Sequence, residues 1–151
     1  MEGHKVTQDA FVSAPDQLLI IRLRSEHPKG LNGSIQLSRP KDDGVATAKT
    51  FTKKGSLIME GEVTQRKGAF DSKPNPISEG VQFQAIVKPN HQGGTVKTFE
   101  NGIVLEGVKE IELRIVSNSS YYHENYKSEN IRQLNRAENY SFEDLKGRHI
   151  R

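Results

Sequence analysis

The chain of 151 residues contains no cysteine. This absence excludes disulfide bonds, thiolate nucleophiles and zinc sites built on cysteine. Long apolar runs are absent too: the longest, residues 18–21, is far shorter than the roughly 20 apolar residues that a membrane-spanning helix needs. We therefore expect neither a disulfide-stapled fold nor a membrane partner.

Apolar residues are scarce, and so is concentrated charge of one sign. Hydrophobic residues make up 33% of the chain, and 22 basic against 19 acidic residues leave a net charge of +3. No block of like charge is longer than a doublet, so we expect no nucleic-acid partner. The chain opens with Met-Glu-Gly-His-Lys instead of a basic stretch followed by an apolar run, and we expect no signal peptide in it.

Motifs for catalysis, metal binding and cofactor binding are missing as well. The five histidines stand far apart in the sequence, so we expect no metal site. Because neither a phosphate-cradling glycine loop nor a Gly-x-Ser-x-Gly elbow is present, we expect no cofactor and no catalytic residue. Glu110 and Glu112 share one side of a predicted strand, as a glycosidase carboxylate pair could. They flank apolar Ile111, however, and we interpret them as a solvent-facing row.

The sequence does contain a series of short strand patterns separated by turn residues. This pattern predicts an all-β fold, either a sandwich or a barrel. The apolar run at 18–21 indicates burial on both faces, so we expect its strand to be the most central one. Residues 65–80 are rich in Gly and Pro and are predicted to form a long loop. The predicted strands are residues 6–13, 17–24, 34–38, 45–52, 56–63, 81–87 and 110–117, with a further hairpin over 95–107.

The hairpin over 95–107 carries the most specific local prediction. Its Asn-Gly pair at 101–102 is typical of a type I′ turn, which requires two residues with positive φ. Counting back from a two-residue loop pairs Phe99 with Val104. The same register pairs Lys97 with Glu106, so that a hydrophobic pair and an ion pair both support it.

From residue 124 onward the pattern changes to helix. Ile131, Leu134 and Ala137 are spaced three residues apart, as on one face of a helix. Ser141 and Asp144 then resemble a capping box at the start of a second short helix. Helices this short, with so few apolar residues, are marginal in water. We therefore expect them to need a partner surface.

Three tyrosines lie close together where the β pattern gives way to helix: Tyr121, Tyr122 and Tyr126. Their rings could stack on a sugar, because an aromatic face combines apolar area with a polar hydroxyl. Alternatively, they cover the junction between the sheet and the helices, or an interface between domains. We favour the junction, because the run coincides with the change of secondary structure.

The chain resembles the N-terminal domain of glycoside hydrolase family 95. The resemblance begins with Ser-Ala-Pro-Asp-Gln at 13–17, followed by the hydrophobic strand at 18–23. Later segments occur in the same order as in that domain: 80–83, 93–96, 102–105, 120–126 and 140–149. The similarity covers nearly the whole chain, and its collinear order carries more weight than any single motif.

This resemblance implies an antiparallel β-sandwich of the super-sandwich type at residues 1–120, in partial form. Residues 121–151 would be a helical linker leading to an (α/α)6 catalytic domain of the same protein. The family contains inverting α-L-fucosidases, so a fucosylated glycan is the implied ligand of that catalytic domain. The family's catalytic carboxylates lie in the barrel, and we expect this chain alone to be inactive. The resemblance also implies a periplasmic or extracellular location for the parent protein.

Two functions from different classes remain open. In the first, the chain braces a catalytic barrel and helps to shape its active-site rim, and it displays Leu134, Phe142 and Leu145 to that missing partner. In the second, it is a free-standing carbohydrate-binding or assembly module that uses the three tyrosines. If strands are missing, an open sheet edge would favour a homodimer of the isolated chain.

Overall fold

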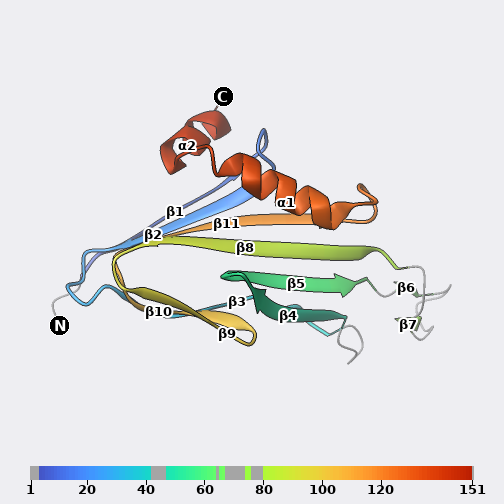
Figure 1. The fold of residues 1–151 in the computed structure, drawn as a ribbon, viewed down its shortest axis with the longest axis horizontal. Coiled ribbons are helices and arrows are strands. Elements are labelled where there is room, and N and C mark those ends of the chain that lie inside the picture. The colour runs from blue at the N-terminus through green and yellow to red at the C-terminus, as the bar shows by residue number, and fades with distance from the viewer. Residues whose placement is uncertain (1–3, 42–46, 64, 67–73, 76–79, 151) are drawn as a thin grey trace.

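The computed structural model describes residues 4–41, 47–63, 65–66, 74–75 and 80–150. These residues form three layers: two helices, a six-stranded antiparallel sheet and a three-stranded antiparallel sheet (Figure 1). The prediction of an all-β antiparallel sandwich with a short helical segment at its C-terminal end is confirmed. No helix in the described ranges is long and apolar enough to cross a membrane.

The six-stranded sheet forms the middle layer. Its strand order, β1-β2-β11-β8-β5-β4, places β11 and β8 at the centre. The strand predicted to be most central is β2, which is second from the edge, so that prediction is wrong. Leu18 and Ile20 face the helices, while Ile21 faces the smaller sheet. The apolar run therefore reflects the two layers that cover β2, and such a run does not require a central strand. The bounds are β1 Val6–Ser13, β2 Leu18–Ser25, β4 Ala48–Lys53, β5 Ser56–Glu62, β8 Gln82–Gln92 and β11 Glu110–Ser119.

The three-stranded sheet has the order β3-β10-β9, with β3 at Leu31–Gln36, β9 at Thr95–Phe99 and β10 at Gly102–Val108. The predicted hairpin of β9 and β10 is confirmed, but its register is wrong. Gly102 itself pairs with Phe99, and neither Asn101 nor Gly102 has positive φ. A Cβ on Gly102 would lie 2.3 Å from the Phe99 ring. The glycine therefore makes room for an aromatic ring and does not form a type I′ turn.

Two separate hydrophobic cores lie on the two faces of the large sheet. One core fills the space against the helices, and the other fills the space between the sheets. Ile86, which shares its face of β8 with the polar residues Gln82 and Gln84, belongs to the helix-side core, while its neighbour Val87 belongs to the inter-sheet core. Both side chains are buried because successive residues of a strand point to opposite faces.

The helices are α1 at Tyr126–Ala137 and α2 at Phe142–Ile150. The predicted capping box is confirmed: the Ser141 amide donates to the Asp144 carboxylate at 3.0 Å, and the Asp144 amide donates to the Ser141 hydroxyl at 3.1 Å. The helices lie on the large sheet, with α1 against β11 and β8 and α2 against β1 (Figure 1). The partner surface that they need is therefore this chain's own sheet.

The strands predicted at 45–52 and 56–63 correspond to β4 and β5, which form an antiparallel hairpin with pairing from Ala48 opposite Gly61 to Lys53 opposite Ser56. Residues 45–46 of the predicted first strand lie outside the described residues. Within the predicted loop at 65–80, β6 (Gln65–Arg66) pairs with β7 (Pro74–Asn75). Of the rest of that loop, only residue 80 belongs to the described part of the chain.

Candidate functional site

The turn between β1 and β2 contains the segment that carried the sequence resemblance. Ser13 and Asp16 are almost completely buried, at 0% and 1% exposure, and the Ser13 hydroxyl donates to the Asp16 carboxylate at 2.6 Å. Arg148 of α2 donates two hydrogen bonds of 3.0 Å to the same carboxylate. Arg136 of α1 lies 3.6 Å from it. Both helices are thus tied to one buried charge, and we call this cluster the Asp16 anchor.

The backbone and amide groups of the same turn strengthen the attachment to α1. Arg136 also donates to the carbonyl of Pro15 at 2.5 Å. Gln17 has a φ of 55° and accepts a hydrogen bond from Gln133 of α1 at 2.9 Å. The segment 13–17 therefore fixes the position of α1 as well as that of α2.

The electrostatics of the anchor keep Asp16 ionised. Burial alone raises the pKa of the Asp16 carboxyl, but the hydrogen bonds from Arg148 and Ser13 and the charges of Arg148 and Arg136 together hold it below its ordinary value. A buried carboxylate is stabilised only when it is paired and hydrogen-bonded, and this one is both. The anchor therefore links the sheet and the helices through a permanent charge at neutral pH.

A second polar cluster lies beneath α1. Asn130 is fully buried and donates to both the backbone carbonyl and the side-chain oxygen of Gln84 at 3.0 Å. The side-chain carbonyl of Asn130 accepts a hydrogen bond from the Asn118 amide at 2.8 Å. Gln84 donates in turn to Glu60, which also pairs with Lys127 at 3.1 Å. These directional bonds fix the register of α1, and the helical pattern of the sequence gave no signal for them.

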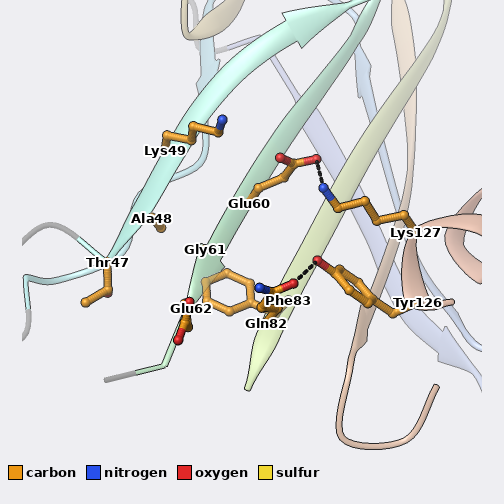
Figure 2. A pocket seen from close by; sticks show the side chains of 10 residues that line it. All are labelled: Thr47, Ala48, Lys49, Glu60, Gly61, Glu62, Gln82, Phe83, Tyr126 and Lys127. Atoms are coloured by element: carbon orange, nitrogen blue, oxygen red, sulfur yellow. Dashed lines mark hydrogen bonds and ion pairs between the residues drawn. The ribbon is translucent and has the colours of Figure 1, made fainter. Parts of the chain in front are cut away.

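The three predicted tyrosines do not form one platform. Tyr121 and Tyr122 are 73% and 79% exposed, and their rings meet edge to face with centroids 4.9 Å apart. Tyr126 is 8% exposed, and its hydroxyl donates to Gln82 at 3.2 Å (Figure 2). The structure therefore separates Tyr126, which packs at the start of α1, from the exposed pair.

The three candidate interface residues, Leu134, Phe142 and Leu145, all lie in the helix-side core of this chain. Leu145 is fully buried, and the Phe142 ring packs edge to face against Phe11 of β1 with centroids 5.4 Å apart. Contrary to the expectation that they are displayed to a missing partner, these side chains are covered by the large sheet.

Glu112 also lies in a different place from the predicted one. The prediction of a solvent-facing row is wrong for this residue, which is 7% exposed and pairs with Arg114 at 2.6 Å. Arg114 donates further to the carbonyls of Ala137 and Tyr140, at the end of α1 and just before α2. The helices cover the face of β11 that its alternation marked as polar. The pair therefore serves to hold the helices and carries no sign of a catalytic carboxylate.

Two adjoining hollows lie beside α1, over β4, β5 and the neighbouring part of β8. One has a volume of about 580 Å³ and is drawn in Figure 2; the other has a volume of about 650 Å³. They share Glu60 and Lys127, so they form one continuous surface, which we call the α1 groove. Its walls include Phe51, Ile58 and Ile131.

The chemistry of these sites favours binding and support. Among the described residues, no group of three His, Asp or Glu side chains could hold a metal ion. Burial raises the pKa values of the Asp16 and Glu60 carboxyls, but hydrogen bonds from neighbouring side chains and nearby cations hold both below their ordinary values, the opposite of what a general acid needs.

Comparison with known proteins gives one family. The family model described as "Glycosyl hydrolase family 65, N-terminal domain" matches residues 1–124, which include all the described strands. No curated protein matches the chain. The match spans most of the chain and agrees with the expected N-terminal domain of a glycoside hydrolase. The chain therefore belongs to the family of N-terminal domains of glycosyl hydrolase family 65.

Proposed function

We propose that this chain is a non-catalytic segment of an α-L-fucosidase of the kind found in glycoside hydrolase family 95, and that it braces an (α/α)6 catalytic domain. The family match supports the coarser part, an N-terminal domain that associates with the rest of a glycosyl hydrolase. The finer part depends on the resemblance of residues 13–23 and of the later segments in the same order. By the same resemblance, the parent enzyme works in the periplasm or outside the cell.

One observation carries the bracing role. The residues that are most typical of the resemblance, at 13–17, are the ones that hold α1 and α2 through the Asp16 anchor. In the proposal, residues 121–151 lead from the sandwich to the catalytic domain. A segment with this task must leave the sandwich at a fixed angle, and two helices tied to one buried charge give that angle. Rigid support of this kind keeps catalytic groups in position.

The test uses the complete reading frame that contains this chain. We expect several hundred further residues that form the barrel, and release of L-fucose from α-1,2-linked fucosides by the whole protein. The variant Asp16→Asn should lower that activity after heating, because it loosens the helices. Arg132→Gln, which removes an exposed ion pair within α1, serves as the matched control. A reading frame without a catalytic segment, or a whole protein that releases no fucose, would overturn the proposal.

A free-standing carbohydrate-binding module is the second candidate, because Tyr121 and Tyr122 are exposed next to each other. In that case the chain by itself should bind a fucosylated oligosaccharide. Replacing both tyrosines by alanine should then abolish the binding. Isothermal titration of the two proteins separates the candidates, because the bracing role predicts no binding by either.

A further inference from the structure

The helix-side face of the large sheet is only partly covered. The helices pack on β1, β11 and β8, while β5 and β4 continue the sheet beyond α1 (Figure 1). On these two strands Phe51 lies opposite Ile58, and Lys49 lies opposite Glu60. Residues that are directly paired point to the same face, and Ile58 belongs to the helix-side core. The α1 groove is therefore a continuation of the surface on which the helices themselves are packed.

The floor of the groove is apolar. Ile58, Ile86 and Leu134 line it from three different elements, and Phe51 lies at its outer side. Ile131 on α1 is 51% exposed above it. Such a surface can accept an apolar side chain from a partner, because each buried methylene contributes favourable transfer free energy.

The rim of the groove is basic. Among the described residues, lysines 49, 53, 54, 88 and 127 line the two hollows together with the carboxylates of Glu60 and Glu62. Lys88 pairs with Glu138, and Lys127 pairs with Glu60. Lys53 and Lys54 are exposed, and no carboxylate of the described residues pairs with either. Among the described lining residues, Lys53 and Lys54 therefore present positive charge to a molecule that enters the groove without a carboxylate of their own.

We propose that the α1 groove docks an acidic segment of the catalytic part of the same hydrolase, in which an apolar side chain is flanked by Asp or Glu. The apolar side chain lies over Phe51 and Ile58, and the carboxylates pair with Lys53 and Lys54. This inference depends on the proposed function, since it names the surface through which the bracing domain meets its partner. Charge complementarity of this kind fixes the register of an interface.

A protein segment fits the groove better than a sugar does. Sugar sites usually present an open aromatic face with hydrogen-bonding groups beside it. Here the aliphatic side chains of Ile58, Ile86 and Leu134 form the floor, and the hydroxyl of Tyr126 is already bonded to Gln82 (Figure 2). Within the described part of the chain, no arginine lines either hollow, whereas phosphate recognition commonly uses arginine.

The test is the reactivity of these lysines in the whole hydrolase. A carbodiimide joins a lysine amine to a carboxylate that it contacts, through an amide bond whose water is taken up by the reagent. We expect cross-links from Lys53 or Lys54 to Asp or Glu of the catalytic part. We also expect both amines to be acetylated roughly fivefold more slowly than those of Lys5 and Lys29, because an ion pair of moderate strength protects an amine to about this extent. Lys5 and Lys29 are exposed away from the groove and are the matched controls.

The variant Lys53→Gln/Lys54→Gln should lose these cross-links, and its domain interface should depend less on salt because two ion pairs that salt screens are gone. Lys5→Gln/Lys29→Gln should behave as the wild type. Equal acetylation of all four lysines, or cross-links only to a second copy of this chain or to bound nucleic acid, would overturn the inference. If either of these results is obtained with a whole protein that is an active hydrolase, the proposed function still stands. If the reading frame has no catalytic part, both fail.

Discussion

Asp16 is the residue at which the sheet and both helices meet. Its carboxylate accepts hydrogen bonds from Ser13 and Arg148, and Arg136 lies within ion-pair distance. Removing one partner of a buried charge pair is costly, because the remaining group keeps its desolvation penalty without the compensating interaction. The stability of the helical layer therefore depends on this one side chain.

We expect Asp16→Asn to lower the free energy of unfolding by about 2–3 kcal/mol, because the amide cannot replace the charged hydrogen bonds from Arg148. Urea unfolding followed by circular dichroism measures this change. Arg132→Gln, in the exposed pair with Glu129, should have a much smaller effect, since solvent screens surface pairs. Equal effects of the two variants would show that the anchor does not hold the helices.

Asp16 also makes the free energy of unfolding depend on pH. The pKa of Asp16 is lower in the folded chain than its ordinary value, so the folded state holds the proton less tightly than the unfolded state. Its contribution is fully present above the unfolded pKa of about 3.9 and is lost as the pH falls through the folded pKa. Urea titrations between pH 6 and pH 2 should show a shallower acid-dependent loss in Asp16→Asn. Identical slopes for the variant and the wild type would contradict this.

At the level of secondary-structure elements, the helices depend on the sheet for their stability. Leu134, Phe142 and Leu145 are buried against the sheet, while Ile131 and Ile150 point away from the core with 51% and 74% exposure. Most helical stability in proteins comes from packing of the apolar face. Neither α1 nor α2 is therefore an independent unit.

We expect Leu145→Ala to destabilise the chain by about 3 kcal/mol, because it leaves a cavity in a fully buried position. Ile131→Ala on α1 should change stability by no more than about 0.5 kcal/mol, because that side chain is half exposed. Thermal and urea unfolding of both variants compares the two positions. A large loss for Ile131→Ala in the isolated chain would mean that another surface covers it there.

The capping box and the β9–β10 hairpin differ in how far local sequence predicts them. The capping box of Ser141 and Asp144 is predictable because both partners are three residues apart and depend on nothing else. The hairpin register is not predictable in this way, since Gly102 is needed for the Phe99 ring and not for positive φ. A packing contact there overrides the usual meaning of an Asn-Gly pair.

At the scale of the whole molecule, the described sheets and helices leave the α1 groove open beside α1. The family match extends over residues 1–124 and therefore over the sheets. The described residues contain buried, paired carboxylates instead of a free acid and base at the spacing of a glycosidase pair. The family match makes the chain an N-terminal domain of a glycosyl hydrolase, and in the proposed function it supports the other parts of that enzyme.

We expect the purified chain to release no fucose from α-1,2-linked fucosides, because the catalytic carboxylates of the proposed parent enzyme lie in the barrel. The assay measures free L-fucose over time, with the complete hydrolase as the positive control. Release that depends on this chain and grows with its concentration would contradict the prediction.

The sequence alone determined where most strands and both helices lie, because alternation, helical spacing and turn chemistry are properties of neighbouring residues. It did not indicate β6 and β7, which lie within the predicted loop. It also indicated the kind of domain, since Ser-Ala-Pro-Asp-Gln at 13–17 and the later segments occur in a typical order. Only the tertiary structure decided which faces are buried. Glu112 and Ile86 lie inside because helices cover a face that alternation marks as polar. Lys53 and Lys54 come to line a groove with Ile131 for the same reason: contacts between distant segments depend on what packs on each face, which local sequence does not encode.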